Sequence, residues 1–74
     1  MRQEEFAIDQ NHLEIGKEYN IIEYGSGVYS YMIENSLGMS HPLPSAKRIK
    51  SKVGKCVEIL DDRKIRAAIL EFDE

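Results

Sequence analysis

The chain has 74 residues, a net charge of −3 and one cysteine, Cys56. A polypeptide of this length forms one small domain, here over residues 1–74, whose core is too small to enclose a deep, water-excluding active site. The lone cysteine excludes an internal disulfide and suits a reducing, cytoplasmic compartment. We expect a soluble protein, because no apolar run approaches the ~20 residues of a membrane span.

The first 17 residues carry only weak structural signals. Residues 1–12 form a polar beginning, predicted either to be loosely ordered, as chain ends often are, or to contain a short edge strand around Phe6 and Ile8. Leu13 and Ile15, followed by a glycine, predict a short strand and a turn that lead into the next strand.

Residues 18–35 are predicted to form a β-hairpin. The segment 18–24 is rich in tyrosine and isoleucine, which favour strands. The Gly-Ser-Gly sequence at 25–27 predicts the turn, because glycine adopts positive φ at little cost. Tyr29 and Tyr31 share one face of the return strand, where they either stack nucleic-acid bases or pack across the hairpin.

Residues 35–45 contain two prolines and several serines, which predict a loop. Leu37, Met39 and Leu43 give this loop apolar anchors that we expect to pack on the rest of the domain. Residues 46–52 alternate in polarity, which predicts a strand with one basic side. The basic side chains of this region, here called the basic stripe, are Lys47, Arg48, Lys50, Lys52 and Lys55.

Residues 53–72 are predicted to form a second hairpin that turns near Asp61 and Asp62. The last segment, 65–72, leaves two alternatives open. Apolar residues on both phases and a hairpin partner directly upstream favour a strand. The helical spacing of its apolar residues allows a helix instead, and these are Ile65, Ala68, Ile69 and Phe72.

Residues 51–59, a charged turn and residues 67–72 resemble the KOW motif of ribosomal and transcription-elongation proteins. Gly54 stands at the glycine position of that motif, Ile59 at a core position, and Cys56 where the motif usually has valine. The resemblance covers under a third of the chain and implies the closing half of an SH3-like barrel and RNA or ribosome binding. In layout the chain also resembles small uncharacterised bacterial barrel proteins.

The elements together predict an all-β fold, a small antiparallel SH3-like barrel of about five strands. An α+β fold with a C-terminal helix is the alternative. Such a closed sheet removes exposed strand edges, which matters for a short chain. The fold leaves the exterior surface for recognition.

The function expected from the sequence is that of a non-enzymatic binding module. It would engage a protein partner through the loop 37–44 and the basic stripe, because residues 35–57 contain five bases and no acid. An RNA- or DNA-binding barrel is the alternative, and it would use Arg48, Lys50, Lys52 and Tyr29/Tyr31. The alternative without a binding function is that the stripe is an edge strand whose lysines suppress aggregation with other sheets. Self-association into a homo-oligomer is also compatible with so small a core.

The sequence predicts no catalytic site, metal site or cofactor. His12, His41 and Cys56 are the only soft ligands or nucleophiles, and their spacing matches no metal-binding or Cys–His pattern. Cys56 is expected to be a packed core thiol. The paired acids at 4–5, 61–62 and 73–74 are explained by solvation at turns and chain ends.

Overall fold

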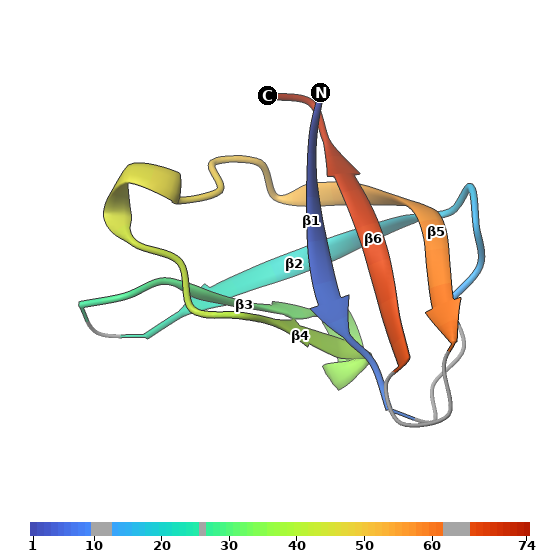
Figure 1. Cartoon of the computed structure of the whole chain (residues 1–74). Helices are drawn as coiled ribbons and strands as arrows, with labels where there is room; N and C mark the ends of the chain where they lie inside the picture. The colour runs from blue at the N-terminus through green and yellow to red at the C-terminus, as the bar shows by residue number, and fades with distance from the viewer. Residues whose placement is uncertain (10–12, 26, 62–65) are drawn as a thin grey trace.

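The computed structural model describes residues 1–9, 13–25, 27–61 and 66–74 and shows a closed barrel of six antiparallel strands (Figure 1). The strand order is β1-β4-β3-β2-β5-β6. The strands are β1 (Arg2–Ala7), β2 (Glu18–Tyr24), β3 (Ser30–Ile33), β4 (Gly38–Ser40), β5 (Val53–Asp61) and β6 (Arg66–Phe72). The predicted all-β, SH3-like barrel is confirmed as a fold class, although six strands form rather than about five.

Parts of several predictions lie outside the described residues: the turn positions Ser26 and Asp62, the side chain of His12 and the beginning of the last segment at Ile65. Within the described part, the predicted turn forms at residues 15–16, but the short strand predicted before it does not. The Gly16 N–H donates to the Cys56 carbonyl at 2.7 Å, so this turn is fastened to β5.

The first hairpin forms as predicted from β2 and β3, with Ile21 opposite Ile33 and Tyr24 opposite Ser30. Gly25 has φ +123°, and a Cβ there would lie 2.5 Å from the Val28 carbonyl oxygen. The turn therefore requires glycine both for its backbone angle and for space.

The second hairpin pairs β5 with β6, so the last segment is a strand and the helical alternative is wrong. The pairing shifts register between Cys56 and Glu58, a bulge that bends β5. β6 also pairs with β1 over six residues, from Arg2 opposite Phe72 to Ala7 opposite Ala67. Residues 2–7 are thus an integral strand, and the two chain ends lie side by side (Figure 1).

The segment between the hairpins differs most from its prediction. Part of the expected loop is the short strand β4, which pairs with β1 at Ser40 and Met39 and with β3 at Met39 and Gly38. A Cβ at Gly38 would lie 2.8 Å from the Ile8 side chain, so a glycine allows this close approach. The expected basic strand 46–52 is wrong: η2 (Ser45–Lys47) is a single 3₁₀ turn, and 48–52 forms no strand.

The barrel interior is filled by side chains from both hairpins and from β1. Phe6 and Phe72 pack with ring centroids 6.2 Å apart, and both are fully buried. Burial of a side chain of this size contributes about 1.5–3 kcal/mol to stability. Tyr31 belongs to the same core, because only 1% of its surface is exposed.

Candidate functional site

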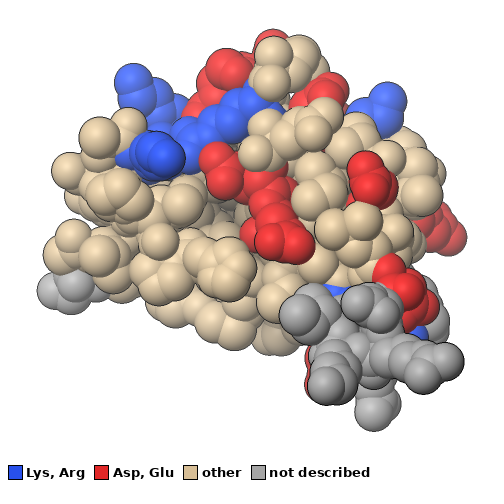
Figure 2. Space-filling view, viewed as in Figure 1, with Lys and Arg blue, Asp and Glu red and all other residues tan. Residues whose placement is uncertain are grey.

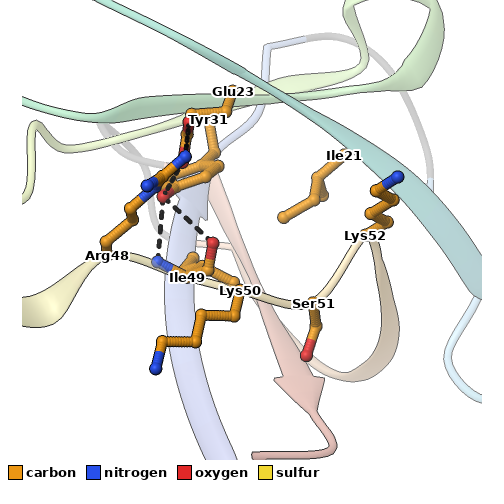
Figure 3. A pocket seen from close by; sticks show the side chains of 8 residues that line it. All are labelled: Ile21, Glu23, Tyr31, Arg48, Ile49, Lys50, Ser51 and Lys52. Carbon is orange, nitrogen blue, oxygen red and sulfur yellow. Dashed lines mark hydrogen bonds and ion pairs between the residues drawn. The ribbon is translucent and has the colours of Figure 1, made fainter.

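An open pocket of about 470 Å³ lies between β2 and residues 48–52 (Figure 3). It is here called the β2 pocket. Ile21 and Glu23 of β2 and Tyr31 of β3 line one side, and residues 48–52 line the other. Its volume lies within the range of ligand-binding clefts. The sequence analysis placed part of the basic stripe here but did not foresee a pocket.

One end of the β2 pocket is closed by hydrogen bonds among Tyr31, Glu23 and Arg48 (Figure 3). The Tyr31 hydroxyl donates to Glu23 Oε2 at 2.6 Å and accepts from the Ile49 N–H at 2.9 Å. Arg48 forms two bonds with the same carboxylate, at 2.8 Å from Nε and 2.9 Å from Nη2. These three side chains tie the basic segment to the first hairpin.

The charges in this cluster compensate each other. The Arg48 guanidinium, together with the Tyr31 hydroxyl, holds the pKa of Glu23 below its ordinary value, and the same ion pair raises the pKa of Arg48. Burial and the bond to Glu23 raise the pKa of Tyr31. The positive charge of Arg48 is therefore paired with Glu23 and is not available to bind an external anion.

The two candidate tyrosines have different environments. The Tyr31 ring is buried, so it cannot stack on a base, and the shared stacking face proposed for Tyr29 and Tyr31 is not formed. Tyr29 is half-buried, forms a bridge with Leu43, and lies 4.8 Å from the Arg48 guanidinium, measured from the ring centroid. The structure thus uses Tyr29 to hold Arg48 through a cation–π contact.

The other side of the pocket is positioned by Glu74 near the C-terminus. Its Oε2 accepts bonds from the N–H groups of Lys50 at 3.0 Å and Ser51 at 2.9 Å, and from the Ser51 hydroxyl at 2.9 Å. Arg2 of β1 pairs with Oε1 of this carboxylate at 3.0 Å. Desolvation opposes ionisation of Glu74, but these donors outweigh it and lower its pKa. Glu74 thereby fixes the backbone of Lys50 and Ser51, which line the pocket opposite β2.

The lysines of the basic stripe carry its remaining positive charge. All four, at 47, 50, 52 and 55, are exposed, and none forms an ion pair with another described residue. Basic and acidic side chains are interspersed on the face that Figure 2 shows. A second depression of about 460 Å³ has Lys52 and Lys55 in its lining together with Glu18, Glu71 and Asp73. The surface around the stripe is therefore mixed in charge.

The predicted loop anchors lie apart from the pocket. Leu37 and Leu43 are partly buried and pack against the core, as expected of a loop that covers the barrel. Met39 is 47% exposed and lies opposite Met32 in the β3–β4 pairing. Of the three, only Met39 is left available for an external contact.

The soft ligands of the sequence do not come together among the described residues. Cys56 is fully buried, and burial raises the pKa of its thiol. His41 is exposed in the loop. No group of three or more potential metal-ligating side chains is found in residues 1–9, 13–25, 27–61 and 66–74. In the same ranges, no helix is long and apolar enough to cross a membrane.

Two pocket-forming residues, Glu23 and Glu74, were missed by sequence reasoning. Glu23 sits in a strand of alternating polarity, and Glu74 is one of two acids at the chain end, so both are typical of solvated positions. Neither carries a local signal for the partner that it binds 25 or 24 residues away. Comparison with known proteins adds no ligand: no family model, curated protein or solved structure matches the chain.

Proposed function

We propose that the chain is a binding module that engages a protein partner through the β2 pocket and the lysines beside it. The observation that carries the proposal is the composition of this one opening. Ile21 and Ile49 are buried at the base of the opening, with 9% and 3% of their surfaces exposed, and the exposed Lys50 and Lys52 line it, while Arg48 is already neutralised by Glu23. The shape of the opening would supply affinity, and the lysines would set orientation and encounter rate.

Mixed charge favours a protein over a nucleic acid as the partner. A phosphate backbone is recognised by several cations that act together, and acids among them weaken the attraction. Arg48 pairs with Glu23, and Lys52 and Lys55 share a depression with Glu71 and Asp73. We place the loop 37–44 in a supporting role, with Met39 as its one exposed anchor. The free thiol of Cys56 fits a cytoplasmic location.

The proposal is tested by charge reversal at the pocket. The variant Lys50→Glu/Lys52→Glu should lose partners that the wild-type chain recovers from cells of its source, with nuclease present. Lys17→Glu is the matched control, because Lys17 is exposed at the beginning of β2 and does not line the pocket. Circular dichroism of both variants checks that the barrel is intact.

Recovered partners are then purified and titrated against each variant. Equal binding by wild type, the double variant and the control would contradict the proposal. Loss of every partner on nuclease treatment would support the alternative, an RNA- or DNA-binding barrel. The four lysines and the KOW-like pattern of β5 and β6 favour that alternative, and its affinity for mixed RNA would fall steeply with salt.

A further inference from the structure

The backbone of β2 shows that the pocket borders an unpaired strand edge. Along a strand, successive N–H groups point to opposite sides. The Asn20 N–H faces β3 and donates to Glu34 at 3.3 Å, whereas the Ile21 N–H faces the other way and donates to the Lys52 carbonyl at 2.8 Å. The Glu23 N–H and C=O therefore face the pocket, and no described residue bonds to them there.

The segment opposite this edge does not satisfy these groups: none of its carbonyls accepts from the Glu23 N–H, and its N–H groups at 49–51, which could donate to the Glu23 carbonyl, are bonded elsewhere. Ile49 donates to the Tyr31 hydroxyl, and Lys50 and Ser51 donate to Glu74. An unpaired strand edge accepts an added extended peptide. The β2 pocket therefore has the space and the backbone groups for an extended segment that the described residues do not supply.

The pocket is closed at both ends, which restricts what can enter. The Ile21–Lys52 hydrogen bond closes one end, and the Arg48–Glu23 ion pair closes the other. A peptide running through would have to break one of them, whereas the end of a chain can enter from the open side. Figure 3 shows the Lys52 side chain extending alongside β2, while Lys50 points away from Ile21. Lys52 thus places an uncommitted ammonium group at the opening.

We propose that the β2 pocket binds the free C-terminal end of an extended polypeptide. A residue of the incoming chain pairs with the Glu23 backbone, and its terminal carboxylate lies at the Lys52 ammonium. The Glu23 carboxylate does not repel this anion strongly, because Arg48 neutralises it with two hydrogen bonds. This inference rests on the proposed function and names its class of partner.

The test uses an array of randomised hexapeptides with free C-termini, followed by resynthesis of the tightest binder as a soluble peptide. We expect this peptide to bind about tenfold more tightly than the same peptide with a C-terminal amide, which has lost a charge-assisted contact. Binding should also slow hydrogen exchange at the Glu23 amide, measured by NMR. Methylation of the peptide nitrogen that pairs with Glu23 should weaken binding by a similar factor.

Lys52→Met and Lys17→Met form a matched pair of variants, because Lys17 is exposed and does not line the pocket. The first should abolish the preference for the free acid over the amide, and the second should preserve it. Absence of any binder from the array, equal binding of acid and amide, or unchanged exchange at Glu23 would each overturn the inference. The two proposals can fail separately. If these peptide tests fail but Lys50→Glu/Lys52→Glu still abolishes binding of a cellular partner, the proposed function stands and only the inference about a C-terminal peptide is wrong, because the partner then uses a different chemistry at the same face.

Discussion

The hydroxyl of Tyr31 shows how one buried polar atom can position a whole segment. It accepts the Ile49 N–H and donates to Glu23, at a site with 1% exposure. Tyr31→Phe leaves the Ile49 N–H without this acceptor, which should lower the free energy of unfolding by about 1–3 kcal/mol in urea denaturation. Tyr24→Phe is the control, and its change should stay within about 0.5 kcal/mol, because Tyr24 is surface-exposed. Equal changes in the free energy of unfolding for the two variants would show that the Tyr31 hydroxyl has no specific structural role.

Gly54 is a packing residue as well as a strand residue. It is buried in β5, and a Cβ there would lie 2.5 Å from the Phe72 ring. Gly54→Ala should destabilise the barrel by about 1–3 kcal/mol, as overpacked cores do, and chemical denaturation measures this. The glycine that suggested the KOW-like pattern is therefore required by an aromatic side chain of this core.

Phe72→Leu provides the control for that steric argument. It removes ring atoms and should cost stability by itself, but it should also reduce the penalty of Gly54→Ala. The double variant should therefore be less destabilised than the sum of the single variants, as expected for residues in contact. Strict additivity would mean that the glycine is needed for its backbone and not for the ring.

At the scale of elements, the hairpins were predictable because their signals are local. β-Branched and aromatic residues mark β2 and β3, Gly25 marks their turn, and an upstream partner identified β6. Residues 48–52 were not predictable, because their conformation depends on Tyr31 and on Glu74, which follows them by more than twenty positions. Alternating polarity normally predicts a strand, but here the backbone N–H groups bond to side chains instead of to a strand.

The Glu74 carboxylate should control the order of residues 48–52. Glu74→Ala removes an acceptor for the amides of Lys50 and Ser51, so both should exchange hydrogen about tenfold faster, which corresponds to about 1.4 kcal/mol. Asp73→Ala is the matched control at the same chain end, where Asp73 is exposed. Unchanged exchange at both amides would mean that other contacts hold the segment.

Acid should release the same segment. The hydrogen bonds that lower the pKa of Glu74 stabilise its ionised form, so their contribution is present above the ordinary value of 4.5 and is lost as pH falls through the lowered pKa. We therefore expect the NMR shifts of the Lys50 and Ser51 amides to titrate with a midpoint below pH 4.5. In Glu74→Gln this titration should disappear, and its persistence would assign it to another acid.

For the whole molecule, the sequence predicted the barrel, but neither the conformation of residues 46–52 nor the pocket. The pocket exists because β2 pairs with β5 over only part of its length. The β2–β5 register ends at Asn20 opposite Val53, and beyond one bond from the Ile21 N–H to the Lys52 carbonyl, residues 48–51 form no strand beside β2. The β2 pocket depends on the pairing of the whole barrel, so no local sequence pattern predicts it.

The cooperativity of this barrel can be measured at Cys56, which lies in β5 with no exposed surface. Because the thiol is not exposed, a thiol reagent can reach it only when the barrel opens. Burial also raises the pKa of the thiol, so little of the reactive thiolate is present while the barrel is closed. With a stability of about 3–5 kcal/mol, labelling should be at least about 10²-fold slower than in the unfolded chain. The variant Cys56→Ser/Ser45→Cys, with its thiol at an exposed position, should react at the unfolded rate. Rapid labelling of Cys56 that is independent of urea would show that β5 separates from β2 locally, and the gap beside β2 would then extend during normal motion.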